Sequence, residues 1–66
     1  MTREEIKLLR QSTLLTRMQF ARILNVSYFA VVSWERGTRN ISAIVSDGIR
    51  AAVARWQREH PFGGKP

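Results

Sequence analysis

The feature that most constrains the fold of this chain is a pair of short helical segments, 16–24 and 28–36, separated by only three residues. Asn25 follows the first segment, and asparagine tolerates the left-handed backbone conformation that ends a helix. Ser27 precedes the second segment as a natural N-cap, and Gly37 follows it as a natural C-terminal residue. The sequence therefore predicts two short helices joined by a tight turn.

Capping signals also mark where the other helices begin. Thr2 has Glu5 three residues later and Thr16 has Gln19 at the same spacing, which is the pattern of a capping box. Ser42 precedes a longer segment with helical periodicity, and no segment has the strong alternating pattern of a strand. The predicted fold is all-α, a small bundle of four helices, or five. Residues 1–59 form the domain. It contains a first helix that fades near 11–13, the helix pair over 16–36 and a long helix over about 43–59. A flexible tail, 60–66, follows the domain.

Length and charge limit the classes of function. Sixty-six residues make one small domain, and the absence of cysteine excludes a disulfide framework and a thiolate metal site. Eleven Lys and Arg stand against five Asp and Glu, which gives a formal net charge of +6. Such a charge suits a polyanion, of which nucleic acid is the common one, although many small proteins are basic without binding DNA. Charge alone leaves both interpretations open.

The side-chain inventory argues against an enzyme. His60 is the one histidine and Asp47 the one aspartate, while Glu4 and Glu5 are adjacent and therefore do not face each other on a helix. No nucleophile–base pair and no metal cluster can be assembled, so we expect no cofactor, no metal and no small-molecule ligand.

Charges within 3–7 argue against a signal peptide, and no apolar run is long enough to span a bilayer. We expect a cytoplasmic protein.

Apolar residues at helical spacing define the expected core. Val31 and Trp34 lie three residues apart, where they can pack on Phe20 and Leu24. The apolar stripe of the 43–59 segment sweeps roughly 180°, wider than the roughly 100° that one core contact needs. Two interpretations remain open: this helix wraps a small core, or part of its stripe meets a second subunit. The dimer-interface candidates are Ile49, Val53 and Trp56.

The ordered set of these residues resembles the lambda-repressor-like, or XRE-type, helix-turn-helix family over about residues 6–49. The matching residues are Ile6 to Arg10, Leu15 and Thr16, Phe20 and Ala21, Leu24 to Ser27, Val31, and Trp34 to Gly37. The resemblance implies a DNA-binding domain that places the second helix of the pair in the major groove. It also implies a homodimer that binds an inverted repeat in double-stranded DNA.

The resemblance places the outer face of the 28–36 helix against base edges. Long polar side chains usually occupy these positions, because they form bidentate hydrogen bonds with bases, but here the side chains are apolar or small. Recognition would then depend on thymine methyl groups, hydroxyl contacts, DNA shape and bridging waters. An exposed apolar patch of this kind can instead bind a protein. The base-contact candidates are Ser27, Tyr28, Phe29, Val32 and Ser33, and Ala30 is expected to face outward with them.

Phosphate contacts are expected from the residues that border this face. Arg17 stands at the start of the 16–24 helix, where the family more often has glutamine and where backbone N–H groups favour an anion. Arg36 and Arg39 flank the loop that follows the 28–36 helix. The phosphate-contact candidates are Thr16, Arg17, Arg36, Thr38, Arg39 and Asn40, with Arg22 as a weaker one.

Arg10 and Glu35 are assigned a structural role instead of a DNA contact. The resemblance implies an ion pair between them that ties the first helix to the end of the 28–36 helix. The alternative is that they are two unrelated surface charges.

Two functional hypotheses remain. The first is a sequence-specific DNA-binding regulator of transcription, acting as a repressor or autoregulator of a phage, plasmid or other mobile element and associated with the nucleoid through DNA. The second is a protein-interaction adaptor or antitoxin-type module that keeps the fold and binds a protein partner.

Overall fold

The computed structural model describes residues 1–61 and contains four helices within them. They are α1 (Arg3–Thr13), α2 (Arg17–Leu24), α3 (Tyr28–Arg36) and α4 (Ala43–Glu59). No strand occurs among residues 1–61. The predicted small all-α bundle of four helices is therefore confirmed. No helix in this part of the chain has the length and apolar character needed to cross a membrane.

Each helix begins at the N-cap residue that the sequence predicts. In α1, Thr2 Oγ1 accepts a hydrogen bond from the Glu5 backbone N–H at 3.1 Å, and Glu5 Oε1 accepts one from the Thr2 N–H at 2.9 Å. Thr16 and Gln19 form the same reciprocal pair at α2, with distances of 3.2 and 3.0 Å. These two complete capping boxes satisfy backbone donors that a helix start leaves free. Ser27 and Ser42 cap α3 and α4.

Three of the four helices end at a residue in the left-handed region of backbone conformation. Asn25 ends α2 with φ 57° and Gly37 ends α3 with φ 79°, as the sequence predicts for these two residue types. Leu14 ends α1 in the same way with φ 62°, although a residue with a Cβ atom is disfavoured there. Its side chain is 70% exposed, so little packing offsets the strain.

Replacing Leu14 by glycine should therefore stabilise the domain. The left-handed conformation costs a residue with a Cβ atom about 1–2 kcal/mol, and the greater freedom of glycine in the unfolded chain offsets about 0.4–1 kcal/mol of the gain. We expect the free energy of unfolding, measured by urea denaturation, to rise by about 0.5–1 kcal/mol. Asn25→Gly is the matched control and should gain less, because asparagine tolerates positive φ. An unchanged midpoint for Leu14→Gly would contradict strain at the end of α1.

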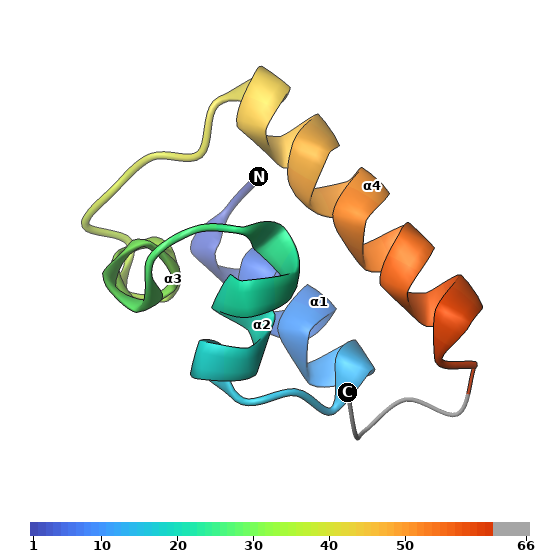
Figure 1. Cartoon of the computed structure of the whole chain (residues 1–66). Helices are drawn as coiled ribbons and strands as arrows, with labels where there is room; N and C mark the ends of the chain where they lie inside the picture. Colours follow the sequence, from blue (N-terminus) through green and yellow to red (C-terminus); the bar gives the residue numbers. More distant parts are fainter. Residues whose placement is uncertain (62–66) are drawn as a thin grey trace.

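The helices pack around one small core. In Figure 1, α3 lies on one side of the molecule and the C-terminal half of α4 on the other, with α1 and α2 between them. α2 contacts both α3 and α4, and α1 contacts α3. This arrangement holds α3 against two helices on its inner side and leaves its other side to solvent. The most deeply buried apolar side chains are Ile6, Phe20, Val31 and Val53.

The apolar stripe of α4 belongs to this core. Of the two interpretations left open, the structure supports a helix that wraps a small core, and Ile49, Val53 and Trp56 are corrected as dimer-interface candidates. Their side chains are 4%, 1% and 6% exposed within a single chain, so they have no surface left to offer a partner. The stripe is wide because α4 covers the side of a very small bundle. The large apolar side chains that α4 exposes are Ile44, at 85%, and Val45, at 41%.

His60 ends α4, although the sequence analysis assigned it to the tail. Its imidazole ring stacks on the Trp56 indole with the ring centroids 4.7 Å apart. Its backbone N–H donates to the Trp56 carbonyl oxygen at 2.9 Å. His60 thus belongs to the folded domain. The predicted tail lies outside the described residues from 62 onward.

Candidate nucleic-acid interface

α3 presents an exposed face made of the predicted base-contact residues. Phe29 is 75% exposed and Tyr28 is 40% exposed, and their rings meet edge to face with centroids 5.8 Å apart. One turn later, Val32 and Ser33 are partly exposed, and Ser27 is exposed just before the helix. The structure therefore brings all five candidates to the surface on or beside one short helix. The face is mainly apolar and aromatic.

Ala30 does not belong to this face, which corrects the prediction that it points outward. Its side chain is 6% exposed and belongs to the core together with Val31 and Trp34. Residues advance by about 100° along a helix, so positions 30, 31 and 34 share the inner side of α3. The sequence could not separate the two cases, because a methyl group fits either environment.

Thr38 already uses both of its donors within the protein. Its backbone N–H and its hydroxyl both donate to the carbonyl oxygen of Ser33, at 3.0 and 3.3 Å. Thr38 could bind a phosphate only at the cost of these bonds, whereas the side chains of Arg36 and Arg39 form none of this kind within residues 1–61. Thr16 differs, since its hydroxyl oxygen accepts from the Gln19 N–H and its own proton remains free to donate.

The exposed cations lie where the sequence predicts them, at the end of α3 and in the loop after it. Arg36 is exposed at the last turn of α3, and Arg39 and Asn40 are exposed in the loop that leads to α4. Neither arginine forms an ion pair with any other residue of the described chain. Both can therefore reach a phosphate without giving up a contact inside the protein.

Glu35 is the centre of an ion-pair cluster. Arg10 Nε donates to Glu35 Oε2 at 2.7 Å and Arg10 Nη2 to Oε1 at 3.4 Å, which confirms the predicted structural pair between α1 and α3. Arg10 Nη1 also donates to the Leu15 carbonyl oxygen at 3.0 Å. The side chain of Glu35 is only 2% exposed and that of Arg10 is 15% exposed. The pair is largely shielded from water and fixes the relative position of the two helices.

Arg17 joins the same cluster, which the sequence analysis missed. Its Nε donates to Glu35 Oε1 at 3.0 Å, and its side chain remains 45% exposed. A pocket of about 320 Å³ has Arg17, Tyr28 and Val32 among its lining residues, so Arg17 borders the exposed face of α3. No hydrogen bond engages its Nη groups within residues 1–61. Arg17 is thus held by Glu35 and still has donors for an external anion.

The pKa of Glu35 is lowered in the folded chain. Burial opposes ionisation and by itself would raise the pKa, but hydrogen bonds from Arg10 and Arg17, together with their positive charges, outweigh it. Glu35 is therefore ionised at neutral pH. Its charge holds two guanidinium groups in place beside α3.

The described residues contain no group of three or more His, Cys, Asp or Glu side chains that could hold a metal ion. The site consists of an exposed apolar helix face with Arg17 and Arg36 beside it. Comparison with known proteins found no match to a protein-family model, to a curated protein or to a solved structure.

Proposed function

We propose that this chain is a sequence-specific double-stranded DNA-binding regulator of transcription that inserts α3 into the major groove. The observation that carries the proposal is the exposed face of α3, held on a packed core, with Arg17 and Arg36 beside it and Arg39 exposed in the loop that follows. An α-helix fits the width of the major groove, and guanidinium groups beside it suit the phosphate backbone. The net charge of +6 adds attraction to any duplex.

The chemistry of the face determines how it would read a sequence. Phe29 and Val32 suit the methyl group of thymine, which lies in the major groove. The hydroxyls of Ser27 and Tyr28 can bond base edges or phosphates directly or through water. The face offers no bidentate amide or guanidinium contact, so we expect a T-rich half-site with a large contribution from DNA shape.

One α3 helix covers only a half-site. We propose that two chains related by two-fold symmetry bind an inverted repeat with their α3 helices about 34 Å apart, which is one turn of the DNA helix. The contact between them involves surface residues of the chain, since Ile49, Val53 and Trp56 are buried in the core. A chain of this size acting through DNA occupancy suits a repressor or autoregulator of a mobile element, located in the cytoplasm.

Selection of bound duplexes from a random pool tests this function. Sequencing the bound fraction should return a T-rich half-site in an inverted repeat. Arg39→Ala should weaken binding to all duplexes alike and reduce the magnitude of the salt slope by about 0.9, the value for one phosphate. Phe29→Ala should instead change the preferred sequence, because its contact is with a base. Arg58→Ala, on the exposed side of α4, is the control and should change neither quantity.

The exposed Phe29 and Tyr28 rings also suit a protein partner, which is the basis of the alternative adaptor function. The same experiment separates the two functions. A pool with no enriched sequence, together with duplex binding that Arg39→Ala does not affect, would contradict regulation through DNA and favour the adaptor.

A further inference from the structure

A groove runs between α1 and the C-terminal half of α3, on the side where Arg17 lies. It consists of two adjoining pockets of about 410 and 320 Å³ that share Lys7, Glu35 and Arg36 in their linings. The second pocket also reaches Tyr28 and Val32 on the exposed face of α3. A group bound in the groove would therefore lie directly beside any base that this face contacts.

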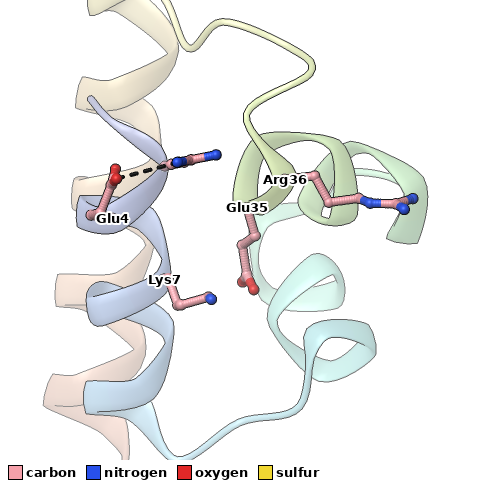
Figure 2. Close-up of a pocket in the computed structure, with 5 residues that line it drawn as sticks. Glu4, Lys7, Glu35 and Arg36 are labelled. Atoms are coloured by element: carbon pink, nitrogen blue, oxygen red, sulfur yellow. Dashed lines mark hydrogen bonds and ion pairs between the residues drawn. The ribbon is translucent and has the colours of Figure 1, made fainter.

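The groove carries an excess of positive charge. Its cations are Arg3, Lys7, Arg17 and Arg36, and its carboxylates are Glu4 and Glu35. Both carboxylates are occupied: Glu35 accepts hydrogen bonds from Arg10 and Arg17, and Glu4 accepts one from Arg3 at 3.3 Å. Lys7 has no ion-pair partner within residues 1–61. Figure 2 shows its ammonium group pointing from α1 toward Glu35, into the space between the two helices.

The cations of α1 are directed toward α3 by the local structure. Arg3 and Lys7 are four residues apart, so they share one face of α1. The Cδ atom of Arg3 lies 3.0 Å from the point that a Cβ atom would occupy on Gly37. Glycine at this position thus admits the arginine stem, and the negative end of the α3 dipole favours its charge. The result is that α1 places two cations along the edge of α3, although the sequence predicts no DNA contact from this helix.

We propose that this groove seats a phosphate of the DNA backbone and that Lys7 is a phosphate-contacting residue. The inference rests on the proposed function, and it extends the DNA contact from α2, α3 and the following loop onto α1. The positive charge of the groove favours an anion. Because the groove lies beside Tyr28 and Val32, that anion is a phosphate of the DNA backbone next to the bases that α3 contacts. Arg17 can contact the same phosphate backbone through its Nη groups while its Nε stays bonded to Glu35 Oε1.

The test compares Lys7→Gln with Arg55→Gln on a duplex of about two helical turns and arbitrary sequence. Both substitutions remove one positive charge from an exposed side chain, but Arg55 lies on the C-terminal half of α4, across the molecule from α3 (Figure 1). Binding is measured by fluorescence anisotropy over a fourfold range of salt concentration. Each phosphate contact contributes about −0.9 to the salt slope. The factor by which affinity falls over the fourfold rise in salt should therefore be about 3.5 times smaller for Lys7→Gln than for the wild type. Arg55→Gln should keep the wild-type slope, and both variants should keep the wild-type thermal midpoint.

Three outcomes would overturn the inference, and they differ in what they say of the proposed function. If Lys7→Gln has the same salt slope as the wild type, the phosphate seat is overturned and the DNA-binding function remains intact. A slope that both variants reduce equally shows a general effect of charge and also overturns the seat. A wild-type chain that binds no duplex at low salt contradicts the proposed function, and the inference with it.

Discussion

Replacing Trp56 by alanine should remove most of the stability of this domain. The indole is 6% exposed and forms part of the core on the inner side of α4. Truncation of a buried tryptophan to alanine typically costs about 3–5 kcal/mol. A chain of this length has roughly 3–10 kcal/mol in total, so the variant should be largely unfolded or close to it. Urea denaturation followed by far-ultraviolet circular dichroism measures the loss.

The comparison with other α4 variants separates a core residue from a subunit contact. Val53→Ala removes less buried volume, so it should cost about 2 kcal/mol and remain folded. Ile44→Ala lies on the same helix but is 85% exposed, and it should change the free energy of unfolding by less than about 0.5 kcal/mol. Both midpoints should be independent of protein concentration. The contrary outcome has two parts: the wild-type chain unfolds as a dimer, and the midpoint of Val53→Ala falls on dilution. Together they would support Val53 as a subunit contact and contradict its place in the core of a single chain.

The helix boundaries could be predicted because the interactions that set them are local. The hydroxyl of Ser27 reaches a backbone N–H three residues later, and Asn25 ends α2 through its own backbone conformation. Such contacts are encoded in a few consecutive residues. The tight turn between α2 and α3 and the limits of α4 therefore follow from the sequence alone.

The contacts between helices could not be derived in this way. Arg17 and Glu35 are 18 residues apart, and their ion pair depends on how α2 crosses α3, which no local pattern contains. The pair between Arg10 and Glu35 was predicted only through the family resemblance. The stripe of α4 was ambiguous for a related reason. The hydrophobic effect favours burial of an apolar side chain such as Val53 equally in the core of its own chain and against a second subunit.

Glu35→Gln should destabilise the domain strongly although it preserves the size of the side chain. The substitution removes the one carboxylate that faces two guanidinium groups, and Arg10, with its side chain 15% exposed, is left without a counterion. Loss of one partner of a buried ion pair costs about 3–5 kcal/mol, and the partial exposure of Arg17 favours the lower end, about 3 kcal/mol. The free energy of unfolding at pH 7 measures the effect. Glu4→Gln removes a charge from an exposed pair with Arg3 and should give an unfolding curve close to that of the wild type.

The pH dependence of this difference provides an independent check of the mechanism. The pKa of Glu35 is lower in the folded chain than in the unfolded chain, where a glutamate has a pKa of about 4.3. As the pH falls, the unfolded state therefore binds the proton before the folded state does. The stability that Glu35 contributes is therefore fully present above this value and is lost as pH falls through the folded pKa. The gap between wild type and Glu35→Gln should stay constant from neutral pH down to about 5 and narrow below about 4. A gap that remains unchanged at acid pH would mean that the carboxylate acts through its shape, and that its charge does not hold Arg10 and Arg17 beside α3.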